Sequence, residues 1–187
     1  MKKFLIGILT ATLLFALAVG VVGCKPQAES EFQAFTDGFN RMTQAKEIRQ
    51  EIEVKNGSLL VYSLEKTYEK GNDAYSVSGE EKKLNEVGAS EAYTVTTIEE
   101  TVQKADTFTT SMRLSEELFS AFEIAEGKLT ASVKDESVNA VFGLNGDHAP
   151  MHNVQLTLTL NDGRISALET VFTSGTYDVQ ILLTFSY

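Results

Sequence analysis

Several residue types are scarce in this chain of 187 residues, and their scarcity excludes whole classes of protein. The sequence has one cysteine, two prolines, two histidines and no tryptophan. A single cysteine excludes a small disulfide-stapled scaffold, because such a scaffold needs cysteine pairs. Only one long apolar run is present, over residues 4–23, so a membrane protein with several spanning helices is excluded as well.

Basic residues are also scarce. The chain has 16 Lys and Arg against 26 Asp and Glu, and two of the basic residues, Lys2 and Lys3, precede the apolar run. From Cys24 onward 14 basic residues face 26 acidic ones, which gives a net charge of −12. We therefore expect no nucleic-acid partner, because contacts with phosphate groups need a basic face.

The N-terminus has the layout of a secretory signal peptide, with two lysines, an apolar stretch of twenty residues and small residues at its end. The four residues Val21-Val22-Gly23-Cys24 resemble the lipobox of bacterial lipoproteins. In that family the cysteine thiol receives a diacylglyceryl group, with acyl chains such as palmitate, and cleavage occurs just before the cysteine. An uncleaved membrane helix is the alternative, since twenty helical residues span about 30 Å.

The lipobox resemblance implies three segments. Residues 1–23 would be the signal peptide, residues 24–29 the lipidated Cys24 and a tether, and residues 30–187 a single folded domain. Two acyl chains make a stable membrane anchor. The domain is therefore expected at the bacterial cell membrane, lipid-anchored and facing outside the cytoplasm.

The domain begins with the pattern of a helix. Phe32, Phe35, Phe39 and Met42 recur at the spacing of one helical face, which predicts a helix over about 30–45. A shorter helix is expected after Ser115, with Leu118, Phe119 and Phe122 on its apolar side. Another is expected over 135–142, ended by Gly143.

From residue 47 the period changes to two, which is typical of strands with one buried face. Turn signals such as Asn56-Gly57 and Asn161-Asp162-Gly163 separate the alternating segments. About eight antiparallel strands in meander order are predicted, in the ranges 47–55, 58–69, 74 into the 80s, 91–103, 128–134, 154–160, 165–172 and 177–187. In the range 165–172 apolar residues occur in both alternating sets of positions, so the sequence does not decide which face of that strand is buried. The fold class is α+β.

The predicted sheet is too wide for its helices to cover. Eight strands at about 4.8 Å give a width of about 38 Å, whereas one helix covers a stripe about 10 Å wide. The sheet should therefore curl into an incomplete barrel with an apolar interior, which is a typical place for a ligand. The alternative is that large aromatic side chains fill this interior.

The lipobox, the Phe-bearing first helix, the long hairpins and the short inserted helices together resemble the LolA/LolB/LppX group of bacterial lipoprotein carriers and lipid-binding proteins. The resemblance covers roughly residues 30–187 and rests on the order of elements. It implies a half-barrel that binds or carries a lipid or another apolar ligand. The candidate ligand-binding residues are the apolar positions Phe32, Phe35, Phe39, Phe119 and Phe122.

Residues that could carry catalysis are few. Asp147, His148 and His152 stand close together, but Gly146 and Pro150 indicate a loop, so no metal is expected there. The adjacent carboxylates are interpreted as solvated charge, since neighbouring strand residues point to opposite faces; these are Glu80-Glu81, Glu99-Glu100, Glu116-Glu117 and Asp135-Glu136. Neither an enzyme nor a cofactor is predicted.

A second hypothesis stays open beside lipid binding. The domain could be a non-catalytic envelope interaction or adaptor module, with a cystatin-like arrangement of one helix and a meander. Such a module would bind a protein partner through its acidic surface and its sheet edges.

Overall fold

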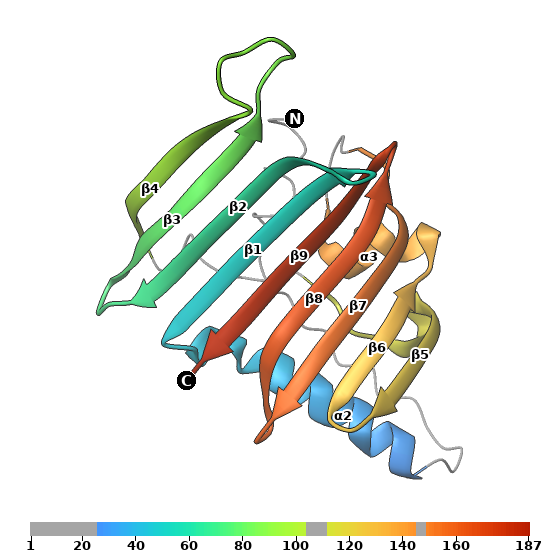
Figure 1. Ribbon diagram of the computed structural model, residues 1–187. Helices are drawn as coiled ribbons and strands as arrows, with labels where there is room; N and C mark the ends of the chain where they lie inside the picture. Colours follow the sequence, from blue (N-terminus) through green and yellow to red (C-terminus); the bar gives the residue numbers. More distant parts are fainter. Residues whose placement is uncertain (1–25, 104–111, 145–148) are drawn as a thin grey trace.

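The computed structural model describes residues 26–103, 112–144 and 149–187. Within these residues the chain forms one open, curled antiparallel sheet of nine strands with helices on one face, an α+β incomplete barrel (Figure 1). The strands are β1 (Glu47–Asn56), β2 (Leu59–Lys70), β3 (Ala74–Leu84), β4 (Tyr93–Gln103), β5 (Phe119–Ala125), β6 (Lys128–Val133), β7 (His152–Asn161), β8 (Arg164–Ser174) and β9 (Tyr177–Ser186). The predicted fold class is confirmed.

The first and last of these strands lie side by side in the middle of the sheet. The strand order is β4-β3-β2-β1-β9-β8-β7-β6-β5, so one meander runs outward from β1 and another runs inward to β9. Their register pairs Glu47 with Ser186 and Lys55 with Asp178. The predicted meander order therefore holds within each half, while a contact between the two ends of the domain joins the halves.

Side chains alternate between the two faces of the sheet. Ile48, Gln50 and Ile52 of β1 are buried on the face that we call the inner face, whereas Arg49 is exposed on the outer face. This pattern confirms the period of two that begins at residue 47. The inner face carries the hydrophobic core, and the outer face is mostly Ser, Thr and charged residues.

Helix α2 (Pro26–Asn40) lies on the inner face of the β5–β9 half, where it packs mainly on β8 (Figure 1). Gly38 makes this approach possible, because a Cβ atom there would lie 2.6 Å from Leu160 Cδ1. Arg41 Nη1 also donates to the carbonyl oxygen of Gly163, at 3.3 Å, in the turn between β7 and β8. These contacts fix the C-terminal end of the helix against the sheet.

The first helix differs from its predicted bounds. It begins at Pro26, a residue that suits a first helical turn because it has no backbone N–H to leave unpaired. It therefore includes residues 26–29 of the segment expected to be a tether. It ends at Asn40, and a 3₁₀ turn, η1 (Met42–Gln44), follows in place of its last helical turn.

The short helix predicted over 135–142 is confirmed. It consists of a 3₁₀ turn, η4 (Asp135–Ser137), and helix α3 (Val138–Phe142), with Val138 and Val141 buried. Gly143 ends it with a positive φ of 59°, the left-handed conformation that favours glycine after a helix. None of the helices in the described residues is long and apolar enough to cross a membrane.

The helix predicted after Ser115 is wrong. Only the 3₁₀ turn η3 (Glu116–Leu118) forms, and the chain then continues as strand β5. This strand was not predicted, and it raises the number of strands from eight to nine. Pairing with β6 supplies backbone hydrogen bonds to a segment rich in Phe and Ile, which suit strands. Glu126 and Gly127, both with positive φ, make the two-residue turn of this hairpin.

Candidate functional site

The five candidate phenylalanines come together on the inner side of the β5–β9 half, but in two environments. Phe35 and Phe39 of α2 and Phe119 of β5 are buried in the core, Phe35 with only 2% of its surface exposed. Phe32 is half-buried and Phe122 is 37% exposed, and their ring centroids lie 5.9 Å apart. The first three rings are therefore packing residues in this conformation, and only the last two reach the surface.

The β1–β4 half of the inner face lies outside the area that helices α2 and α3 cover (Figure 1). In Figure 1 neither α2 nor α3 lies behind β2, β3 or β4. Large side chains line this region, and their exposure increases from β1 toward β4. Buried here are Ile52, Tyr62, Leu64, Tyr68, Tyr75 and Val77, and half-buried are Ile98 and Val102.

Charged residues share this half of the inner face with the apolar ones. The strand register places Lys66 of β2 opposite Gln50 of β1 and Gly79 of β3. Lys66 Nζ lies 2.7 Å from Glu100 Oε1 of β4, two strands away. The side chains of Lys66 and Glu100 are 19% and 45% exposed, so this ion pair is partly shielded from water.

Gly79 allows the side chain of Lys66 to cross β3 and reach Glu100 of β4. Glycine has no side chain to stand between Lys66 and β4, so the lysine can extend over β3 to the carboxylate. The backbones of β2 and β3 are also unusually close here, because a Cβ atom at position 79 would lie 2.0 Å from the carbonyl oxygen of Glu65. A glycine inside a strand often marks such a close approach or a bend of the sheet.

A second carboxylate, Glu81 of β3, is held by two donors. Tyr62 donates its hydroxyl to Glu81 Oε1 at 3.0 Å, and Lys83 Nζ lies 2.6 Å from Oε2. Burial alone would raise the pKa of Glu81, but the hydrogen bonds from Lys83 and Tyr62 outweigh it and hold this pKa below its ordinary value. Burial and the hydrogen bond to Glu81 raise the pKa of Tyr62.

Tyr68 and Gln50 form the third part of the arrangement. Both are buried, and the Tyr68 hydroxyl donates to Gln50 Oε1 at 3.2 Å. Burial, together with the negative charge of Glu100, raises the pKa of Tyr68 to about 12. We call the whole set the inner-face polar cluster: Gln50, Tyr62, Lys66, Tyr68, Glu81, Lys83 and Glu100. Its two lysines and two glutamates make it neutral overall.

The cluster offers hydrogen-bond donors and acceptors beside apolar side chains, an arrangement that suits binding a molecule with one polar end. The apolar positions of β2 alternate through Tyr62, Leu64 and Tyr68, and Lys66 interrupts them in the same phase. That interruption was the sequence signal for a charge on the buried face. In the described residues no group of three or more His, Cys, Asp or Glu side chains could hold a metal ion.

The other polar candidates are scattered. His152 is exposed, with Nδ1 3.7 Å from Asp135 Oδ2, whereas Asp147 and His148 lie outside the described residues. The strand carboxylates point to opposite faces as predicted, and Glu80 pairs with Lys82 on the outer face. Glu81 points inward with its side chain only 22% exposed, so the interpretation as solvated charge is wrong for this residue. Glu99 and Glu100 divide in the same way by their register. The two remaining pairs, Glu116-Glu117 and Asp135-Glu136, are exposed in 3₁₀ turns.

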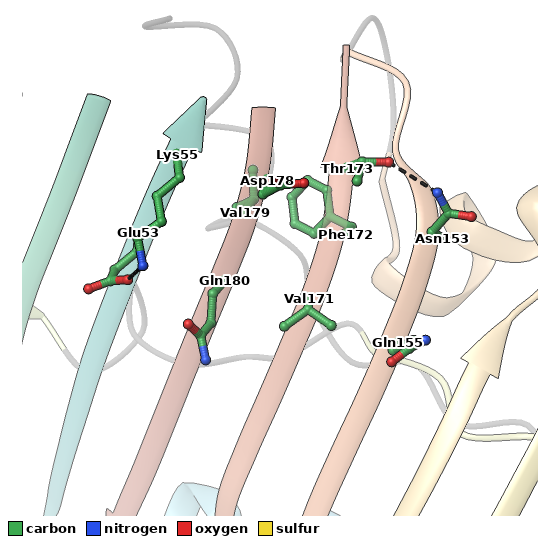
Figure 2. Close-up of a pocket in the computed structure, with 10 residues that line it drawn as sticks. All are labelled: Glu53, Lys55, Asn153, Gln155, Val171, Phe172, Thr173, Asp178, Val179 and Gln180. Atoms are coloured by element: carbon green, nitrogen blue, oxygen red, sulfur yellow. Dashed lines mark hydrogen bonds and ion pairs between the residues drawn. The ribbon is translucent and has the colours of Figure 1, made fainter. Parts of the chain in front are cut away.

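The outer face carries a shallow hollow of about 340 Å³ across β1, β9, β8 and β7 (Figure 2). Seven of its ten lining residues are polar or charged, and the other three are Val171, Phe172 and Val179 (Figure 2). Asn153 adopts a positive φ of 54° at a bulge of β7 and donates to Thr173 Oγ1 at 3.3 Å. This hollow lies on the face opposite the core, so it is a different place from the predicted apolar interior.

Comparison with known proteins gives no family. No family model and no curated protein match the chain. Among solved structures, LprF from Mycobacterium bovis is similar with a TM-score of 0.42 and 11% sequence identity, covering 83% of this chain and 92% of that chain. The Mycobacterium tuberculosis lipoprotein LppX is similar with a TM-score of 0.37 and 9% identity, covering 83% and 94%. Likenesses of this size assign neither a family nor a ligand to this chain.

Proposed function

We propose that this protein is a membrane-anchored lipoprotein facing outside the bacterial cytoplasm, and that it binds a lipid or another apolar ligand on the inner face of β1–β4. The lipobox residues from Val21 to Cys24 support the anchor. The proposed role is non-catalytic, and the proposed ligand-binding site is the inner face of β1–β4.

One observation carries the binding proposal. Nine strands at about 4.8 Å give a sheet about 43 Å wide, and α2 and α3 lie over its β5–β9 half (Figure 1). The apolar side chains of the other half lie under neither helix (Figure 1), and their exposure is greatest on β4. Leu64 and Val77 are buried there and Ile98 is half-buried closer to the free edge, so an apolar chain would reach this face from the β4 side.

The position of Ile98 gives a sharper test than the phenylalanines. A charge at Phe35 or Phe39 would fall in the packed core and unfold the domain. Ile98 is half-buried on the inner face of β4, and Thr97 is exposed on the outer face of the same strand. Ile98→Glu should therefore reduce uptake of a fluorescent acyl-chain lipid, while Thr97→Glu should leave it unchanged. Equal uptake by the two folded variants would contradict the proposal.

A second candidate function has its own supporting observation. Among the described residues β4 is an edge strand of the sheet; it is eleven residues long and pairs with β3 without a bulge. The opposite edge, β5, is seven residues long, has a register shift near Phe119 and contacts α2. Proteins usually protect long edges against pairing, and an open edge can accept a partner's strand.

The edge observation favours an adaptor that binds an extended protein segment. Because β4 carries Glu99 and Glu100 and the domain is acidic, the partner's segment should be basic. A photoreactive residue at the exposed Val95 should then crosslink one partner at defined stoichiometry. Glu99→Lys should weaken that crosslink, whereas a partner captured equally well by Glu99→Lys would argue against pairing at this edge.

A further inference from the structure

We propose that the inner-face polar cluster recognises a zwitterionic group, so the ligand of this site is an amphiphile whose polar end carries one negative and one positive charge. This inference rests on the proposed function, because the apolar part of the ligand would lie on the β1–β4 half of the inner face. The inference goes further than the proposed function because it names the class of amphiphile that the site selects.

The charges of the cluster are balanced and paired. Lys66 meets Glu100 at 2.7 Å, and Lys83 meets Glu81 at 2.6 Å. The Glu81 pair is also fixed by the Tyr62 hydroxyl, which leaves that carboxylate with two partners. Lys66 and Glu100 therefore form the pair that a ligand can open with the least disturbance, and Glu100, at 45% exposure, is within its reach.

Opening this pair favours a ligand with two opposite charges. An anionic group bound to Lys66 would displace Glu100 and leave its carboxylate without an opposite charge, next to the buried Tyr68. A cationic group bound to Glu100 would leave the ammonium group of Lys66, whose side chain is only 19% exposed, without an opposite charge. A partly buried charge without a partner is costly. A zwitterion replaces both partners at once, with its anionic part on Lys66 and its cationic part on Glu100.

The surroundings place the rest of the ligand. Lys66 lies in β2 between Leu64 and Tyr68, and Ile98 occupies the position on β4 opposite Gly79. Leu64 and Val77 are buried on the same face. A headgroup held between Lys66 and Glu100 would therefore lie beside apolar side chains, with its acyl chains directed toward the half-buried Ile98 near the β4 edge.

The test compares three lipids with identical acyl chains on the full chain extracted from membranes in detergent. Native mass spectrometry measures the bound fractions of phosphatidylethanolamine, phosphatidylglycerol and diacylglycerol. Phosphatidylethanolamine should bind at least about tenfold more tightly than the other two, the scale expected of charged hydrogen bonds. Equal binding of all three would overturn the inference and leave the proposed function standing, whereas binding of none would overturn both.

Charge variants separate recognition from folding. Glu100→Gln should lose the preference for phosphatidylethanolamine and gain affinity for phosphatidylglycerol, because Lys66 is then free to hold an anion. Lys66→Met should lose affinity for both phospholipids and keep that for diacylglycerol. Glu65→Gln is the matched control, since Glu65 precedes Lys66 on the outer face and pairs there with Arg49 at 3.5 Å. An unchanged lipid preference in folded Glu100→Gln would overturn the inference.

The source of the zwitterion is tested with glycerophosphoethanolamine, which has the same headgroup and no acyl chains. At equal concentration it should compete poorly with phosphatidylethanolamine, because it cannot use the apolar surface around Leu64 and Ile98. Competition at comparable concentrations would show that the site takes a small soluble zwitterion. That result would overturn the assignment of an amphiphile.

Discussion

The ammonium group of Lys66 lies 2.7 Å from a carboxylate oxygen of Glu100, although an entire strand separates their backbones. The contact depends on Gly79, which offers no side chain between them. The same glycine brings the backbones of β2 and β3 close together. One residue thus links the shape of the sheet to the position of a charge on its inner face.

Replacing Gly79 should therefore destabilise the fold. In Gly79→Ala the new methyl group would meet the carbonyl oxygen of Glu65, a backbone atom that cannot move aside alone. The free energy of unfolding should fall by about 1–3 kcal/mol, the usual cost of overpacking, as measured by urea denaturation. Ser78→Ala, at the exposed neighbouring position on the outer face, is the control. Equal stability of the two variants would mean that the close approach does not constrain the sheet.

The two environments of the phenylalanines predict unequal costs of truncation. Phe35→Ala removes a ring that is 2% exposed, and it should cost about 3–5 kcal/mol of unfolding free energy. Phe122→Ala removes a ring that is 37% exposed, and it should cost about 1 kcal/mol or less. Thermal or urea unfolding measures both. A Phe35→Ala variant as stable as Phe122→Ala would show that Phe35 is not a core residue.

The raised pKa of Tyr68 predicts a loss of stability at alkaline pH. Its pKa is raised to about 12 by burial and by the charge of Glu100, above its ordinary value of 10.0. The folded state therefore holds this proton more tightly than the unfolded state, and the resulting stability is present below pH 10 and lost as the pH rises toward 12. Absorbance titration of tyrosinate should show late-ionising tyrosines, Tyr62 among them, and Tyr68→Phe should reduce this late phase by one group. An unchanged late phase in that variant would contradict the assignment.

The lowered pKa of Glu81 predicts a loss of stability at acidic pH. Burial opposes ionisation of this group, but the hydrogen bonds from Lys83 and Tyr62 lower its pKa below the ordinary value of 4.5. Its contribution to stability is therefore present above pH 4.5 and lost as the pH falls through the folded-state pKa. Glu81→Gln should be less stable at neutral pH and should lose less stability on acidification. Glu80→Gln, on the outer face, is the control, and identical acid unfolding of both variants would contradict the prediction.

The helix and the hairpins were predictable because their signals are local. Apolar spacing gave the helix around Phe35 and Phe39, and turn residues such as Asp162 and Gly163, both with positive φ, gave the hairpins. The uncertain face of β8 has a local cause too. Ser166 is an extra residue opposite the step from Thr159 to Leu160, so the buried phase changes along the strand.

The remaining features depend on contacts between distant segments. The pairing of β1 with β9 joins residues more than a hundred positions apart, and no short-range pattern encodes it. The segment that begins at Phe119 fits helical spacing, but pairing with β6 makes it a strand. The position of Glu100 beside Lys66 likewise needs the register of three strands and a glycine between them, which only the folded sheet provides.

The central claim is that the inner face of β1–β4 holds a lipid in the cell. Native mass spectrometry of the full chain extracted from bacterial membranes tests it most directly. We predict the mass of the chain with its anchor at Cys24 plus a further lipid that organic solvent releases, retained in Thr97→Glu and reduced in Ile98→Glu. A spectrum with only the covalent anchor, and no uptake when lipids are offered, would contradict the account.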